Sequence, residues 1–143
     1  MGQRVNDRVT VSAAADEVMA VIVDLESYPE WAEGVKTVDI HETDDDGRPV
    51  EATFEVDAQV QRVTYRLHYT HEPSRLSWRL VDSNVLTQLD GVYDLAPNGD
   101  GTDVDYTIEA DISIPLPGFI KKRAAKVILN TGLRGLKRRV EGS

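Results

Sequence analysis

Two periodicities divide the chain, with helical spacing near both ends and strict alternation between them. Val5, Val9 and Val11, with mostly polar neighbours, predict a first strand. Apolar residues from Val18 to Leu25 then recur at helical spacing, and Ser12 is the predicted N-cap of this helix. Pro29 ends the helical pattern, so residues 28–31 are predicted to form a tight turn or a second short helix.

The middle of the chain, from Val35 to Ile112, has a period of two. Short polar turns divide it into six apolar series, and Asp44–Gly47 has the composition of a hairpin turn. Six consecutive strands joined by short turns predict an antiparallel sheet, and their one-sided alternation predicts a single covered face. On the strand near residues 62–70, alternation places these side chains inward: Val63, Tyr65, Leu67 and Tyr69.

A long helix is predicted at the C-terminal end. Pro115 and Pro117 end the sheet, and Gly118 to about Arg139 predicts one helix roughly 33 Å long. It is the only element long enough to cover the apolar face of the sheet. A helical projection places its small and apolar residues on one broad face: Ala124, Ala125, Ile128, Leu129, Gly132, Gly135 and Leu136.

The small residues on this helix face have two interpretations. Gly132 and Gly135 together cost about 2 kcal/mol relative to alanine in a helix, so bulk at these positions is expected to be harmful. In the first interpretation, the helix backbone packs closely on strand side chains. In the second, a straight helix under a curved sheet leaves an apolar pocket with a few tyrosine hydroxyls, which suits a small amphipathic ligand.

Length and composition are typical of a single globular domain. At 143 residues, with 41% hydrophobic and 29% charged residues, the chain needs neither a metal nor a disulfide to fold. The absence of cysteine excludes disulfides, thiol catalysis and zinc–thiolate sites. The first residues lack the apolar stretch of a secretion signal, so a cytoplasmic location is expected.

The net charge of −9 is distributed unevenly. Residues 117–143 carry a net charge of +7, and the remaining residues carry −16. One interpretation is a basic helix attracted to an acidic body, and the other is a surface for nucleic acid or an anionic membrane. The acidic remainder would repel phosphate within a Debye length of about 8 Å. We therefore expect no nucleic-acid partner and no stable membrane insertion.

Residue spacing gives little support for a metal or nucleotide site. His68 and His71 are three positions apart on a strand or its end, so their side chains are expected on different faces. Asp44–Gly47 lacks the spaced ligands of a calcium loop, and Gly99–Gly101 lacks the lysine of a phosphate-binding loop. We therefore expect no metal site and no cofactor.

Three motifs, in this order, resemble those of a known superfamily. Asp24–Trp31 has the pattern D-x-E-x-Y-P-x-W and is followed by Val35; Leu89–Tyr93 and Leu133–Glu141 are the second and third motifs. The chain resembles the START-like (SRPBCC) superfamily, in particular its polyketide cyclase/dehydrase and coenzyme Q-binding group. The resemblance covers essentially the whole chain and implies one START-like ligand-binding domain, 1–143. It implies an α+β helix-grip fold, in which a curved antiparallel sheet of about seven strands wraps around a long C-terminal helix, with two short helices after the first strand.

The resemblance also suggests which positions would line a pocket. The positions that match polar and aromatic pocket residues of polyketide aromatases are Tyr28, Val35, Thr64, His68, Trp78 and Gly91. At three of them, Val35, His68 and Gly91, the chain departs from the residue types of those enzymes. The resemblance implies that Arg62, Thr64, Arg66 and His68 face inward, whereas alternation predicts the apolar set one position along. We favour the apolar set, because two buried arginines without visible partners would be costly.

Three functions follow from these observations as hypotheses. The first is binding of a hydrophobic small molecule (lipid, quinone or polyketide-like) between the sheet and the C-terminal helix, with an entrance near residues 28–31 and Pro115–Phe119. The second is a polyketide cyclase, aromatase or dehydratase with His68 as acid/base and Tyr28 or Tyr65 as hydrogen-bond donors. The third is a basic helix that engages RNA or a protein. The predicted ligand-binding residues are Tyr28, Trp31, Phe54, Tyr65, Leu67, Trp78, Leu89, Gly91, Tyr93, Tyr106, Ala124, Ile128, Gly132 and Gly135.

Overall fold

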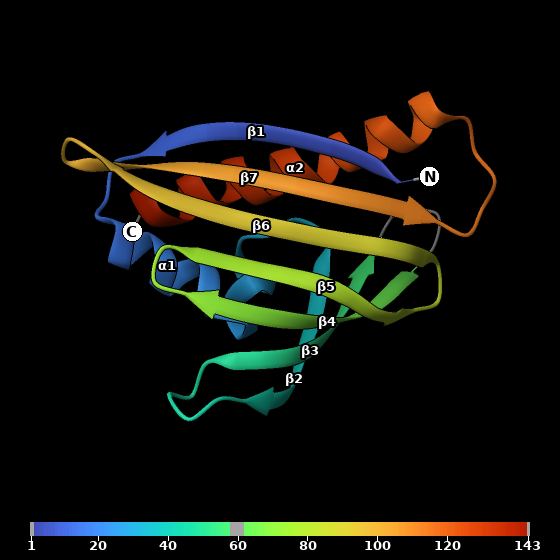
Figure 1. The fold of residues 1–143 in the computed structure, drawn as a ribbon, viewed down its shortest axis with the longest axis horizontal. Helices are drawn as coiled ribbons and strands as arrows, with labels where there is room; N and C mark the ends of the chain where they lie inside the picture. The colour runs from blue at the N-terminus through green and yellow to red at the C-terminus, as the bar shows by residue number, and fades with distance from the viewer. Residues whose placement is uncertain (1, 58–61, 143) are drawn as a thin grey trace.

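A computed structural model describes residues 2–57 and 62–142, and its main element is a seven-stranded antiparallel sheet with helices against one face (Figure 1). The predicted order of one strand, two short helices, six strands and a long helix is confirmed. The elements are β1 (Gln3–Val11), α1 (Ala15–Val23), the 3-10 helix η1 (Leu25–Glu30), β2 (Val35–Thr43), β3 (Pro49–Asp57), β4 (Arg62–Glu72), β5 (Arg75–Ser83), β6 (Leu86–Asn98), β7 (Gly101–Ile112) and α2 (Gly118–Glu141).

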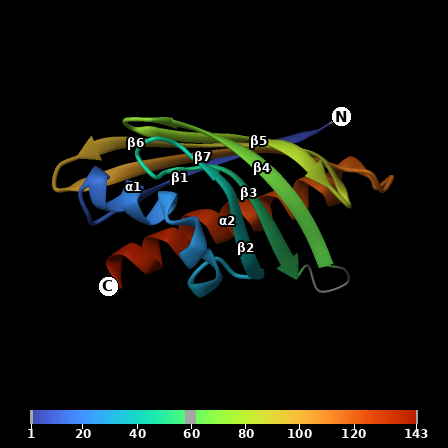
Figure 2. The ribbon, with the colours of Figure 1, turned by 90° about the horizontal axis from the view of Figure 1, so that it is seen from below.

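The strands follow one another across the sheet except for the first. Their order is β1-β7-β6-β5-β4-β3-β2, so β1 pairs with the last strand while the other six form consecutive hairpins. Figure 2 shows the sheet curving around α2, which runs along its concave face. The tight turn between β2 and β3 contains Gly47 at a φ of 81°, a conformation that glycine adopts without strain. This curvature gives the sheet one inner and one outer face.

The register of β4 agrees with the alternation argument. Leu67 and Tyr69 are buried, whereas Arg66 lies on the outer face, where its Nε donates to Glu51 Oε2 at 2.7 Å. His68 Nδ1 lies 3.4 Å from the other oxygen of the same carboxylate. The inward placement of Arg62, Thr64, Arg66 and His68 that the resemblance implied is therefore wrong. The outer face keeps the guanidinium partly hydrated and paired, which avoids the cost of a buried charge.

The start of α1 differs from the prediction. The helix begins at Ala15 with Ala14 in the N-cap position, and no side chain caps it. The predicted cap, Ser12, instead donates its backbone N–H to Glu141 Oε2 at 2.8 Å. The segment between β1 and α1 is thus tied to the end of α2 through the Ser12 N–H.

Helix α2 buries a narrower face than the helical projection predicted. Its buried positions are Ala125, Leu129, Leu133, Gly135 and Leu136, whereas Ala124 and Ile128 are exposed. Helix α2 packs against β1 and β7 through this face, and Ala124 and Ile128 lie at its exposed border. None of the helices in residues 2–57 and 62–142 is long and apolar enough to cross a membrane.

Candidate functional site: an interior lined by tyrosine and tryptophan

All five tyrosines and both tryptophans of the chain meet between the concave face of the sheet and the helices. They come from four strands and from the η1 segment, and their rings form two groups. The Trp78 cluster contains Tyr69, Trp78, Tyr93 and Tyr106, and the Trp31 cluster contains Tyr28, Trp31, Phe54 and Tyr65. The two clusters are joined through β4, which supplies one tyrosine to each.

The Trp78 cluster is the more tightly packed of the two. The rings of Tyr93 and Tyr106 stack with centroids 4.2 Å apart and an interplanar angle of 12°. The Trp78 ring lies 5.6 Å from the first ring and 5.8 Å from the second, in tilted contacts. A side chain at Gly91 would overlap the indole of Trp78, so this glycine makes room for the ring. Gly91 therefore serves the aromatic packing of β5 on β6.

Close packing also explains the two helix glycines. A Cβ at Gly132 would overlap the Tyr106 ring and lie 3.0 Å from the Tyr93 hydroxyl oxygen. A Cβ at Gly135 would lie 3.1 Å from the Trp31 carbonyl oxygen and 3.2 Å from its indole. Of the two interpretations of these glycines, the structure supports close approach of the helix backbone to aromatic rings. Because these glycines have no side chain, the aromatic rings of Tyr106 and Trp31 can approach the backbone of α2.

Hydrogen bonds divide the tyrosine hydroxyls into two kinds. The Tyr28 hydroxyl donates to the Ile22 carbonyl at 2.6 Å, and the Tyr93 hydroxyl donates to the Gly132 carbonyl at 3.1 Å. For the hydroxyls of Tyr65 and Tyr69, the described part of the chain supplies no hydrogen-bond partner. These two hydroxyls remain available to an acceptor that enters from outside.

The Trp31 indole contributes a third donor. Its Nε1 is buried and, within the residues described, has no acceptor. A buried donor without a partner costs about 1–3 kcal/mol, so native proteins rarely retain one without a reason. The donor lies in the Trp31 cluster, where the Tyr28 and Trp31 ring centroids are 4.8 Å apart.

Burial raises the pKa of every tyrosine in the interior. Loss of hydration is the main cause for Tyr28, Tyr65, Tyr69, Tyr93 and Tyr106. Repulsion among their phenolates raises the pKa of four of them further, because the hydroxyls lie within electrostatic range of one another. All five therefore stay protonated at neutral pH and present O–H donors. These O–H groups are the hydrogen-bond donors of the interior.

Several predicted site residues belong to this interior and others do not. Most of the predicted ligand-binding residues lie in the two clusters or against them. Leu67 and Leu89 are buried core residues at 3% and 6% exposure. Ile128 is 40% exposed and lies outside the aromatic packing.

One member of the site was missed, and one predicted catalytic residue lies elsewhere. Tyr69 was not predicted as a site residue, although the alternation of β4 placed it on the same face as Tyr65. His68 lies on the outer face beside Glu51, so an interior acid/base role for His68 does not fit the structure. Within residues 2–57 and 62–142, no group of three or more histidine, aspartate or glutamate side chains is arranged to hold a metal ion.

Comparison with solved structures places this interior in a known architecture. A START superfamily protein from Mycobacterium smegmatis is similar at 25% identity and a TM-score of 0.91, with 97% of each chain covered. The Zhui aromatase/cyclase from Streptomyces sp. R1128 is similar at 16% identity and a TM-score of 0.82, with 99% of this chain and 94% of that chain covered.

A STAR-related lipid transfer protein from Xanthomonas axonopodis is similar at 19% identity and a TM-score of 0.75, with 96% of this chain and 85% of that chain covered. No curated protein sequence matches the chain significantly. A family match covers residues 2–141, which is nearly the whole chain. The chain therefore belongs to the family described as polyketide cyclase / dehydrase and lipid transport, within the START superfamily.

Proposed function

We propose that the chain binds a hydrophobic small molecule with carbonyl or similar acceptor oxygens between its sheet and α2. The observation that carries this proposal is the set of unpartnered donors, the hydroxyls of Tyr65 and Tyr69 and the indole N–H of Trp31, on an otherwise apolar aromatic surface. Lipids, quinones and polyketide-like compounds combine an apolar body with such oxygens.

Two kinds of interaction would contribute to affinity. Burial of apolar ligand surface contributes about 25 cal/mol per Å2 before the costs of association are subtracted. Each hydrogen bond from a buried donor adds about 0.5–1.5 kcal/mol. Because the clusters contain no charged side chain, an anionic ligand headgroup would find no counter-ion there, and a neutral acceptor is favoured. The chemistry of the site thus matches a neutral, oxygen-bearing ligand.

The relatives support the same range of ligands. The family description combines polyketide cyclases, dehydrases and lipid transport. One structural neighbour is named an aromatase/cyclase and another a lipid transfer protein. The two names cover aromatase/cyclase activity and lipid transfer, which are the two kinds of function considered for this interior.

Intrinsic fluorescence provides a direct test, since both tryptophans, Trp31 and Trp78, lie in the site. We expect titration with 2-methyl-1,4-naphthoquinone to quench the emission along a saturable curve, while free N-acetyltryptophanamide shows only linear quenching. Native mass spectrometry of protein purified without detergent should show a retained apolar molecule or a bound quinone. Linear quenching alone, together with an unliganded mass after quinone addition, would contradict the proposal.

Polyketide cyclase or dehydrase activity is the second candidate function. The free hydroxyl of Tyr65, and that of Tyr28 once released from Ile22, could donate a hydrogen bond to a ketone as it enolises. The two clusters contain no carboxylate or imidazole to act as a base, and His68 lies on the outer face. Turnover of a poly-β-ketone substrate that falls strongly in Tyr65→Phe but not in His68→Ala would favour this candidate. Binding without turnover would leave the carrier function.

A further inference from the structure

The connection between β7 and α2, together with the first half of α2, exposes an unusual number of large apolar side chains. Phe119 is 67% exposed and Val127 is 61% exposed. Four more apolar side chains of this region are between 38% and 44% exposed: Ile114, Leu116, Ile120 and Ile128. In the described residues, only Val81 has comparable exposure elsewhere. Figure 1 shows this region at the end of the molecule opposite the C-terminus. We call these six residues the apolar end.

Unpaired basic residues surround the apolar end. Lys122, Arg123 and Lys126 form no ion pair within the described chain. Elsewhere on α2, Lys121 pairs with Asp111 and Lys137 pairs with Glu141, both at 2.8 Å, and Arg139 pairs with Glu30 at 3.0 Å. Residues 112–140 contain no aspartate or glutamate, although the whole chain contains 25. Positive charge and exposed apolar surface therefore coincide in the first half of the helix.

The two kinds of side chain occupy neighbouring sectors of α2. At 3.6 residues per turn, Ile120, Val127 and Ile128 fall within a sector of about 100°. The basic residues Lys122, Arg123 and Lys126 fall within an adjacent sector of about the same width, and Phe119 in the first turn of the helix projects from that sector as well. Helices with this division lie in the interfacial plane of a bilayer, with the apolar side among acyl chains and the basic side at the headgroups.

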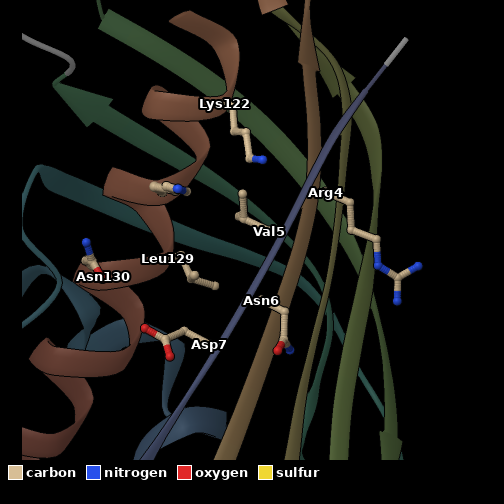
Figure 3. Close-up of a pocket in the computed structure, with 8 residues that line it drawn as sticks. Arg4, Val5, Asn6, Asp7, Lys122, Leu129 and Asn130 are labelled. Carbon is tan, nitrogen blue, oxygen red and sulfur yellow. The ribbon is translucent and has the colours of Figure 1, made fainter. Parts of the chain in front are cut away.

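A groove beside β1 extends the basic sector. Figure 3 shows this groove, about 560 Å3 in volume, between β1 and α2. Lys122 and Lys126 line it from the helix and Arg4 from the strand, while Val5 and Leu129 are apolar members of the lining. Its full lining is Arg4, Val5, Asn6, Asp7, Lys122, Lys126, Leu129 and Asn130, with Asp7 as the one acidic residue. Figure 3 shows Lys122 pointing toward β1, whereas the Arg4 side chain points away from α2 and the Asp7 carboxylate points toward it, so the cations of this groove come from the helix.

We propose that the apolar end and its basic surround dock peripherally on an anionic membrane surface. Charge and shape indicate a membrane as the partner. The exposed apolar side chains protrude from a helix and a loop, and a fluid bilayer can accommodate such side chains without a complementary pocket. The acidic body is repelled by anionic lipid, so the molecule is oriented with this end toward the bilayer. The inference rests on the proposed function in one respect, because docking would bring a hydrophobic ligand to its lipid reservoir.

Vesicle flotation tests the proposal directly. The protein is mixed with vesicles of phosphatidylcholine alone, or with 30 mol% phosphatidylglycerol added, and the bound fraction is measured at low and high salt. We expect binding to the anionic vesicles only, with a marked decrease at high salt. The double variant Lys122→Glu/Lys126→Glu should lower the partition coefficient at least tenfold, since each basic residue near the surface contributes roughly a fivefold factor. Phe119→Ser should lower it severalfold without any change in charge.

Matched controls exclude a general effect of charge or hydrophobicity. Lys36→Glu/Arg79→Glu makes the same change in net charge on β2 and β5, and Val81→Ser removes an exposed apolar side chain from β5. These controls should retain binding. Equal loss in the control pair, or no binding of the wild type to anionic vesicles, would overturn the proposal. A wild-type dimer in light scattering that Phe119→Ser dissociates would assign the apolar end to a second copy instead.

Quinone titration keeps this inference separable from the proposed function. None of the vesicle-binding variants changes a residue of the two aromatic clusters, so saturable quenching should persist in all of them. If the wild-type protein shows saturable quenching by the quinone but does not bind anionic vesicles, the docking inference is refuted and the proposed function is not. Vesicle binding without any saturable quenching removes the proposed ligand instead.

Discussion

The two kinds of tyrosine hydroxyl predict opposite effects of the same chemical change. Tyr93→Phe removes a hydroxyl that donates to the Gly132 carbonyl at 3.1 Å, and it leaves that bond unmade. We expect a loss of about 1–1.5 kcal/mol in the free energy of unfolding. For a chain of this size the loss corresponds to a decrease of roughly 3–5 °C in Tm. Tyr65→Phe removes a hydroxyl without a partner in the described chain, so the protein should be equally stable or up to about 1 kcal/mol more stable.

The same two variants should have the opposite order of effect on ligand affinity, with Tyr65→Phe now the more damaging change. Tyr65→Phe, alone or with Tyr69→Phe, removes donors that are free for a ligand, and each lost bond should weaken quinone affinity about fivefold. Tyr93→Phe should leave affinity nearly unchanged, because its hydroxyl is already engaged with the helix. Urea unfolding followed by circular dichroism gives the stability, and fluorescence titration gives the affinity. If Tyr65→Phe destabilised the protein as much as Tyr93→Phe, the assignment of a free hydroxyl would be refuted.

Three further predictions concern packing and charge. Gly132→Ala should destabilise the protein by about 1 kcal/mol in urea unfolding. The overlap of the new methyl group with the Tyr106 ring outweighs the gain of about 1 kcal/mol in helix propensity. A net stabilisation would contradict the close contact. Gly91→Ala should displace the neighbouring indole, so a shift in tryptophan emission and weaker quinone binding are expected, and unchanged values would argue against the packing described. The hydrogen bond from Lys121 lowers the pKa of Asp111 from 3.8 to about 2, so its stabilisation is full above pH 3.8 and is lost as the pH falls toward 2. Lys121→Met should therefore move the acid-unfolding midpoint to higher pH by circular dichroism, and an unmoved midpoint would show that this pair does not stabilise the fold.

The architecture could be predicted because it depends on local patterns. Alternation located the strands, and helical spacing with prolines before it located α2, whose bounds differ from the prediction by about two residues at one end. The register of β4 was settled by an energetic argument, since burial of Arg66 would need a partner that only the outer face supplies in Glu51. Periodicity combined with the cost of burying charge was therefore sufficient for the fold.

The details of the site depend on contacts that no local pattern contains. The helical projection could not separate Ala124 and Ile128 from the buried stripe, because the angle at which α2 meets the sheet is set by the whole curve of the strands. The ambiguity of Gly132 was resolved only by the position of the Tyr106 ring. Whether the hydroxyl of Tyr65 finds an acceptor depends on atoms that are distant in sequence, so the distinction between free and engaged tyrosines required coordinates.

The open edges of the sheet have a consequence for the proposed ligand-binding function. Strand β2 has a single neighbour, β3, and among the described residues no backbone hydrogen bond ties it to α2. A closed barrel fixes its diameter through a continuous ring of such bonds, whereas here the distance between the β2 edge and the helix is set by side chains alone. Bending of β2 and β3 would therefore change the distance between this edge and α2 without breaking the ladder, and under the proposed function it would fit the interior to ligands of different size.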